Sequence, residues 1–373
     1  MANARPSNWA AGRAGPRTLL LLLALLQSGC GAIRVPAVNY RLPAGAHLPL
    51  ASSGIQDRRA EFAATFCGVL RELDPGGAKW GDCGDWVEDA AAPAPTLPPL
   101  NPNYRILLIS EILSQCAEPH VQMYSDAQKR LDAERISVHY ESVPALGSSE
   151  FNAEIIARYL ASQYPQDARK FIVVGYSKGA PDVQVMLANY PLARDAVAAL
   201  ITVAGSVGGS RLPDSLPSET QSWIRQLKLK NCQTGDGKAF ESLRREVRQQ
   251  FLEKNPRPLK PTYSLAAVSK KARTSRILLP SWRLLLAYAQ EQDSQMILYE
   301  AIAPGAAFLG VARGDHWAVA MPFEVWNFRP AQRLVNHNHY PRVALLEAAV
   351  RLVMQDLPHI PGPCIRIPYC SSR

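Results

Sequence analysis

Three short motifs, two of metal, redox or cofactor sites and one of a serine nucleophile, are missing from this sequence of 373 residues. No two cysteines have the Cys-x-x-Cys spacing of a metal or redox site. The run Gly205–Gly209 lacks the Gly-x-Gly-x-x-Gly spacing that binds dinucleotides. No lysine follows a serine by three positions, which excludes the Ser-x-x-Lys form of a serine nucleophile. We therefore expect no metal ion and no cofactor.

Long hydrophobic runs are missing too. The apolar run Leu19–Leu26 is shorter than the about 20 residues that span a bilayer, and no other segment is long and apolar enough to do so. The run is preceded by Arg5, Arg13 and Arg17. A basic region, a short apolar region and the small residues that follow are typical of a secretory signal peptide, which we place at residues 1–29.

Cys30 adds a second feature to this signal. The sequence Ser28-Gly29-Cys30-Gly31 resembles the lipobox of bacterial lipoproteins, whose cysteine is diacylated and becomes the mature N-terminus. Gln27 stands where leucine is usual, and a plain cleaved signal is the alternative. Gly31 resembles the outer-membrane sorting pattern. We expect an exported lipoprotein that is anchored to the outer membrane or located in the periplasm or at the cell surface.

The cysteine count agrees with export. There are seven cysteines, and six remain if Cys30 carries lipid. In an oxidising compartment six cysteines can form three disulfides, with fifteen possible connectivities. The short loops favour Cys67–Cys83 and Cys364–Cys370, which leaves Cys116–Cys232, and free buried thiols are the alternative for this last pair.

Positive charge is concentrated in one part of the chain. The formal charge is +9, and residues 225–276 hold fourteen Lys and Arg against four Asp and Glu. Such a stretch can be a solvated face or can meet anionic lipid. No nucleic-acid module is recognisable, so we expect no nucleic-acid partner.

The chain divides at about residue 104. Residues 30–103 read as a proline-rich N-terminal arm with one helix at 56–73, where apolar residues recur at helical spacing. From Tyr104 onward, short strands that are apolar on both faces alternate with helices, which indicates a mostly parallel sheet with helices on both faces. The alternation stops at about 212–261, where we expect a helical lid. Its predicted apolar residues are Trp223, Ile224, Leu227, Phe240, Leu243, Val247 and Phe251, and its cations that could meet anionic lipid are Lys228, Lys230, Arg244, Arg245 and Arg248.

The stretch "FIVVGYSKGAPD" carries the candidate nucleophile, Ser177. An apolar strand precedes it and a helical segment follows it, which is the context of a nucleophile elbow. Gly175 and Gly179 permit the close backbone approach that such a turn needs. Serine is a weak nucleophile by itself and needs a histidine as base and an acid to orient that histidine.

The histidine and the acid are expected after the serine, with the acid first. His316 directly follows the last candidate strand, whereas the other downstream histidines lie in a polar segment or a proline-rich tail (His337, His339 and His359). Asp293 lies between the last two strands and is the preferred acid. The alternatives are Asp315, Glu291 and Glu300.

At these residues the chain resembles the α/β-hydrolase superfamily, on its bacterial secreted lipase and esterase side. The motifs that carry the resemblance are "GYSKGAPD", "VAGSVGGS", "QDSQMI" and "GDHWAVAMP", within about residues 104–357. The resemblance implies an α/β-hydrolase fold with an inserted lid, and an oxyanion hole formed by the backbone N–H groups of Lys178 and of Ile112 or Glu111.

The predicted function is hydrolysis of a lipid or small acyl ester by Ser177, His316 and Asp293 through an acyl-enzyme. An acyltransferase would use the same residues with a different acceptor. A lipoprotein that kept the fold for binding and lost the chemistry is a third possibility, which Glu111 in the oxyanion loop favours. The expected partners are an acyl-ester substrate and a membrane.

Overall fold

The computed structural model describes residues 56–90, 92–94, 96–110, 112, 114–117, 120–164, 166–215, 232–326 and 329–358. The signal peptide, Cys30, the Cys364–Cys370 pair, Glu111 and the first predicted lid helix with Trp223 lie outside these residues. Within these ranges, no helix has the length and apolar composition to cross a membrane.

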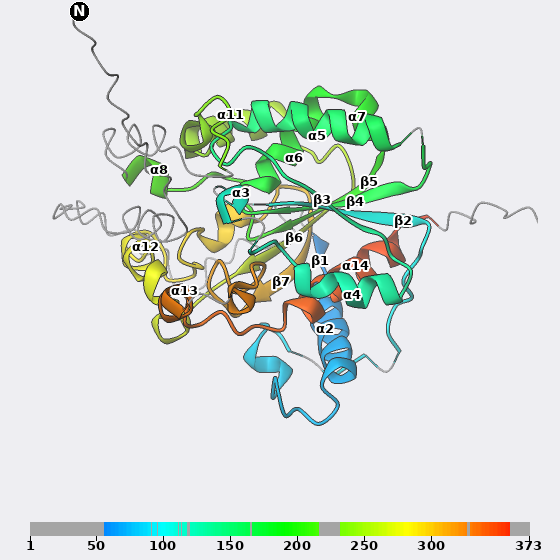
Figure 1. Ribbon diagram of the computed structural model, residues 1–373, viewed down its shortest axis with the longest axis vertical. Coiled ribbons are helices and arrows are strands. Elements are labelled where there is room, and N and C mark those ends of the chain that lie inside the picture. Colours follow the sequence, from blue (N-terminus) through cyan, green and yellow to red (C-terminus); the bar gives the residue numbers. More distant parts are fainter. Residues whose placement is uncertain are drawn as a thin grey trace, which may run out of the picture.

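A seven-stranded parallel sheet forms the centre of the molecule (Figure 1). Its strand order is β1-β7-β6-β5-β4-β2-β3. The bounds are β1 Gln56–Asp57, β2 Tyr104–Ile109, β3 Val138–Glu141, β4 Lys170–Tyr176, β5 Val197–Val203, β6 Thr262–Ala267 and β7 Ala307–Ala312. The predicted parallel sheet is therefore confirmed, and β1 adds an edge strand that the sequence did not predict.

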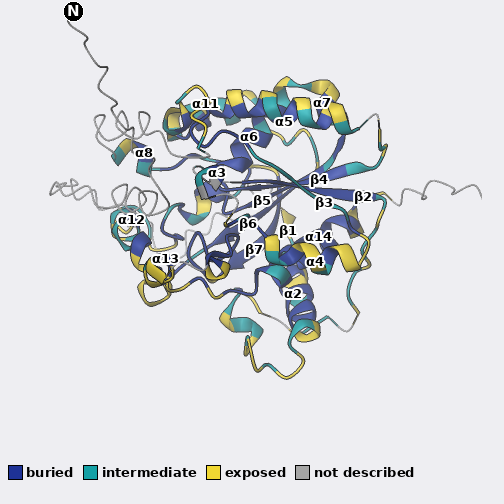
Figure 2. Ribbon diagram, viewed as in Figure 1, coloured by how far each residue is buried: buried dark blue, intermediate teal, exposed yellow. Residues whose placement is uncertain are grey.

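Helices cover both faces of this sheet, because the strands are apolar on both sides. In β4, Ile172, Val174 and Tyr176 join the core beneath α2 (Arg59–Leu73), α4 (Ser125–Ala133) and α14 (Arg342–Asp356). Phe171 and Val173 join the opposite core beneath α5 (Ser149–Gln163), α6 (Gly179–Asn189) and α7 (Pro191–Asp195). Strands β2, β4, β5, β6 and β7 are accordingly buried along almost their whole length, whereas β3 is half-buried and β1 is exposed (Figure 2).

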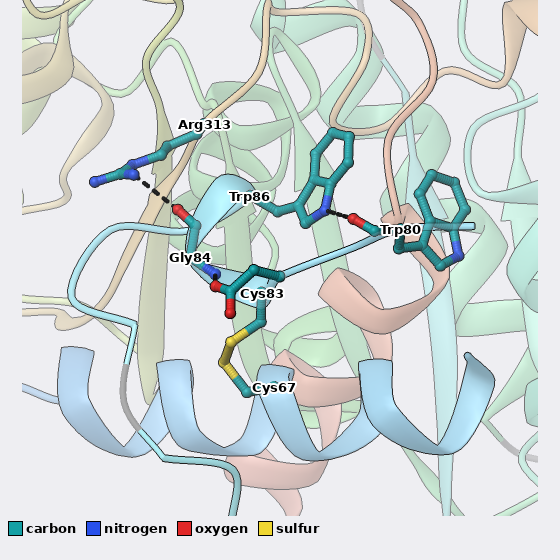
Figure 3. The surroundings of a disulfide bond; sticks show 7 residues. Cys67, Trp80, Cys83, Gly84, Trp86 and Arg313 are labelled. Atoms are coloured by element: carbon teal, nitrogen blue, oxygen red, sulfur yellow. Dashed lines mark hydrogen bonds between the residues drawn. A yellow bond between two sulfur atoms is a disulfide. The ribbon is translucent and has the colours of Figure 1, made fainter. Parts of the chain in front are cut away.

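The helix predicted at 56–73 is α2, and it packs in the same core as the sheet. Phe62 and Phe66 are almost fully buried there. The Cys67–Cys83 disulfide forms as predicted and fastens the loop that carries Trp80 and Trp86 to this helix (Figure 3). The division of the chain at residue 103 stays a prediction.

One part of the lid prediction is wrong. The part of the lid region that holds Phe240 and Phe251 does form helices, α10 (Ala239–Ser242) and α11 (Arg245–Lys254). Arg248, which was expected to meet anionic lipid, is 1% exposed. Its guanidinium donates to the carbonyl oxygen of Val207 at 3.0 Å and to Oε1 of Gln184 at 2.6 Å. A buried and hydrogen-bonded arginine cannot reach a lipid head group, so this part of the prediction is wrong.

The remaining elements lie between those above. They are η2 (Cys83–Asp85), α3 (Ser114–Ala117), α8 (Leu212–Ser215), η3 (Lys271–Arg273), η4 (Arg276–Leu278), α12 (Leu279–Leu285), η5 (Leu298–Ala301), η6 (Phe323–Val325) and α13 (Arg329–Leu334). The second disulfide, Cys116–Cys232, joins α3 to the part of the lid region that follows residue 231.

Candidate active site

Ser177 occupies the turn between β4 and α6, and its backbone is strained. Its φ is 52°, in the left-handed region that residues with a Cβ rarely adopt. Such a conformation costs about 1–3 kcal/mol and persists where the surrounding structure enforces it. Backbone hydrogen bonds do so here, because Ser177 N donates to Val203 O at 3.0 Å and Ser206 N donates to Ser177 O at 3.0 Å.

The two glycines beside Ser177 allow α6 to approach the sheet. A Cβ on Gly179 would lie 2.3 Å from the carbonyl oxygen of Ile109, and one on Gly175 would lie 2.7 Å from Cα of Ala180. Both distances are too short for real contacts. Any side chain at these positions would push the first turn of α6 away from β2 and β4.

Asp293 and His316 form a buried pair on two neighbouring loops. Oδ2 of Asp293 lies 2.7 Å from Nδ1 of His316, and both residues are 0% exposed. The other carboxylate oxygen, Oδ1, accepts from the backbone N–H groups of Gln295 at 2.8 Å and Met296 at 2.7 Å. The backbone N–H of His316 also donates to Asp293 O at 2.8 Å. Both the side chain and the backbone of Asp293 therefore fix the imidazole.

Tyr176 brings this pair to the end of β4. Its hydroxyl donates to the carbonyl oxygen of His316 at 2.6 Å, and the two rings lie 5.1 Å apart between centroids. Because Ser177 is the next residue, the strained turn and the Asp293–His316 pair meet at the same edge of the sheet. Sequence reasoning missed Tyr176, whose only local signal is its position directly before the serine.

The other candidate acids face different partners. Asp315 accepts from the backbone N–H groups of Ser275 at 2.7 Å and Ala318 at 2.9 Å, and burial raises the pKa of its carboxyl group. Glu300 is paired with Arg245 at 2.6 Å, and burial likewise raises its pKa. Glu291 is exposed.

The remaining downstream histidines lie elsewhere. His337 and His339 are exposed, and His339 stacks on Trp80 with ring centroids 4.1 Å apart. His359 lies outside the described residues. Over the part of the chain that the structure describes, no group of three or more His, Cys, Asp or Glu side chains could hold a metal ion.

The candidate oxyanion residues lie on two different segments. Lys178 starts the first turn of α6, and Ile112 follows β2 in a partly buried position against Leu146 and Ala239. Ile112 thus contacts the start of α10, at the base of the lid region. The side chain of Lys178 is 1% exposed and lies beside both carboxylate oxygens of Asp182, at 2.7 and 2.8 Å. Sequence reasoning missed Asp182, although its spacing of four residues from Lys178 is a signal for a helical ion pair.

Comparisons with known proteins identify the fold. No protein-family model and no curated protein matches the chain. Among solved structures, the metagenomic carboxyl esterase MGS0156 is 29% identical with a TM-score of 0.76, and the match covers 83% of this chain and 95% of that one. The mature lipase BlEst2 of Bacillus licheniformis is 21% identical with a TM-score of 0.47, over 62% of this chain and 88% of that one. Together with the parallel sheet and the strained serine turn, the similarity to the metagenomic esterase shows that the chain has the α/β-hydrolase fold.

Proposed function

We propose that this protein is a serine hydrolase that cleaves carboxylic esters through Ser177, His316 and Asp293. The observation that carries the proposal is the buried 2.7 Å contact between Asp293 Oδ2 and His316 Nδ1, at the sheet edge where Ser177 has a φ of 52°. The similarity to a carboxyl esterase supports the reaction type.

In the proposed first half-reaction, Ser177 Oγ attacks the ester carbonyl carbon while its proton passes to Nε2 of His316. Asp293 keeps the Nδ1–H tautomer and stabilises the imidazolium that forms. The carbonyl oxygen becomes an oxyanion, for which the backbone N–H groups of Lys178 and Ile112 are the proposed donors. Collapse of this intermediate breaks the ester C–O bond, and His316 returns the proton to the leaving alcohol.

The second half-reaction regenerates the enzyme. His316 removes a proton from a water molecule, and the resulting hydroxide attacks the acyl carbon. The bond to Ser177 Oγ breaks, the proton returns to this oxygen, and the carboxylic acid leaves. An acyltransferase would replace the water by another hydroxyl acceptor at this step, so the fate of the acyl group in water decides between the two.

The decisive experiment compares the wild-type protein with Ser177→Ala. We expect the wild type to hydrolyse nitrophenyl esters and to react with a fluorophosphonate probe, and the variant to do neither while it keeps its melting temperature. Equal turnover of wild type and variant would refute the assignment of Ser177. A folded wild type that is inert to both reagents would instead favour the binding-only lipoprotein.

We also propose that the protein is exported and that Cys30 carries a lipid anchor. The support is the basic and apolar N-terminal sequence with small residues before Cys30. Both disulfides within the described residues agree with an oxidising compartment.

A further inference from the structure

A buried ion pair lies directly behind the candidate nucleophile. Lys178 is the residue after Ser177, and its Nζ lies 2.7 and 2.8 Å from the two carboxylate oxygens of Asp182. The Lys178 side chain is 2% exposed and the Asp182 side chain is 0% exposed. Burial lowers the pKa of Lys178, against the opposing effect of the Asp182 charge. Two charges have therefore been removed from water within one turn of the candidate catalytic serine.

The pair also connects α6 to its neighbour α5. Asp182 Oδ2 accepts from Nδ2 of Asn152 at 2.8 Å, and Asn152 is 1% exposed. The backbone N–H of Asp182 donates to Lys178 O at 3.2 Å, so the same turn is closed twice, once by the backbone and once by the side chains. The first turn of α6 is consequently tied to itself and to α5.

Stability alone is a poor explanation for this arrangement. Buried ion pairs are often no more stabilising than apolar side chains of similar volume, because desolvation offsets the attraction between the charges. A buried ion pair can also hold the backbone in one conformation. Ser177 needs such a restraint because its φ of 52° is strained. A turn that could unwind at residue 178 would allow this strain to relax and would move Oγ away from His316.

We propose that Lys178 is a positioning residue, whose buried ion pair with Asp182 clamps the first turn of α6 and so holds Ser177 Oγ and the backbone N–H of Lys178 in their reactive geometry. This inference rests on the proposed function. It assigns a role to the Lys178 side chain that is separate from the oxyanion role of its backbone. Every substitution of Lys178 other than proline keeps the backbone N–H, so a loss of activity reports on position and not on the presence of the donor.

The test is the double variant Lys178→Met/Asp182→Asn. It removes both charges, whereas the asparagine keeps an oxygen that can accept from Asn152. The matched control is Arg351→Met/Glu347→Gln, because Arg351 and Glu347 form another buried pair four residues apart, at 2.7 Å in α14. The measurements are melting temperature, kcat and KM for a soluble nitrophenyl ester, and the rate of fluorophosphonate labelling of Ser177.

We expect the double variant to lose about 10- to 100-fold in kcat and in labelling rate, the size of effect that a displacement of about 1 Å produces, with KM little changed. The α14 control should keep wild-type kcat, even if its melting temperature falls by more than that of the Lys178→Met/Asp182→Asn variant. If the double variant does not fold, Lys178→Met alone is assayed well below its own melting temperature, with the same expected losses.

Wild-type kcat and labelling in the folded double variant, or in Lys178→Met where it replaces the double variant, would overturn the positioning role. An equal loss of kcat in the α14 control would overturn it too, because the effect would then follow stability. A wild-type protein that is inert toward the ester and the probe would overturn the proposed function, and this inference with it.

Discussion

Two buried aspartates near His316 offer a sharp test of the proposed mechanism. Asp293 and Asp315 are both 0% exposed, and both accept two hydrogen bonds or more. They differ in what they hold, since Asp293 contacts the imidazole and Asp315 contacts backbone N–H groups only. The substitutions Asp293→Asn and Asp315→Asn change the same atoms, but the first should lower activity and the second should lower stability.

Asp293→Asn should remove catalysis and leave most of the loop intact. The remaining carbonyl oxygen can still accept from Gln295 and Met296. The new NH₂ group would face Nδ1 of His316 and favour the tautomer that carries its proton on Nε2, which cannot accept a proton from Ser177. Loss of the correct tautomer in a Ser-His-Asp triad costs about 10⁴-fold in kcat. This factor corresponds to about 5.5 kcal/mol of transition-state stabilisation.

Asp315→Asn should instead lower stability. An asparagine has one carbonyl oxygen, so it can accept from either Ser275 or Ala318 but not from both. One buried N–H then lacks an acceptor, which costs about 1–3 kcal/mol. At about 2–4 °C per kcal/mol for a large domain, the melting temperature should fall by about 2–12 °C. The Asp293–His316 contact is untouched, so kcat should stay near the wild-type value.

The assay is steady-state hydrolysis of a soluble nitrophenyl ester at 25 °C, together with thermal unfolding of both variants. The reverse ranking, with Asp315→Asn inactive and Asp293→Asn active, would move the acid to Asp315. Equal loss of activity in both variants, at matched loss of stability, would show that activity falls with the loss of a buried carboxylate in general, and would refute the catalytic role of Asp293.

Three further predictions concern other parts of the chain. Gly179→Ala should lower kcat by about 100-fold, because its Cβ would lie 2.3 Å from a carbonyl oxygen of β2. The control Gly76→Ala should keep wild-type kcat, because its Cβ would have no atom within 4 Å. A kcat near wild type in Gly179→Ala would refute the close approach of α6 to β2. Burial raises the pKa of Glu141 to about 7, so its stabilising contribution is present below about pH 4.5 and is lost as the pH rises through 7. Glu141→Gln should therefore raise the melting temperature at pH 8 but not at pH 4, and the exposed Glu134→Gln at neither; an equal effect at both values would contradict this. Cys30→Ser should release the protein from the membrane fraction or block its processing, and mass spectrometry that finds an unlipidated mature start elsewhere would remove the anchor.

The sequence predicted the sheet well because its strands carry a strong local signal. Strands β4 and β5 are the clearest examples. Each is a run of apolar residues whose side chains are buried on both faces of the sheet. Strand β1 carries no such signal, because it is two residues long and exists only through its pairing with Ala307 and Phe308. The prediction therefore failed where an element depends on a partner distant in the chain.

The same limit explains the results at the site. The strained turn at Ser177 was predictable, since the glycines and the flanking elements are local. The burial of Arg248 was not, because its hydrogen-bond acceptors are Val207 and Gln184, which are 41 and 64 residues away. Charge in a sequence predicts exposure unless such tertiary acceptors exist. The catalytic roles of Ser177, His316 and Asp293 stay predictions.

The Cys116–Cys232 disulfide has a consequence for how the protein would come apart. It closes a covalent ring with a sequence separation of 116 that contains β3, β4 and β5, and therefore Ser177, whereas Asp293 and His316 lie outside the ring. A single cut by a protease between the two cysteines would leave every fragment joined until a reductant is added. Closing a ring of about this size lowers the conformational entropy of the unfolded chain, which raises its free energy by about 5 kcal/mol. A protein nicked there would lose this ring but would stay one molecule, with its serine still joined covalently to the loops that hold its acid and base.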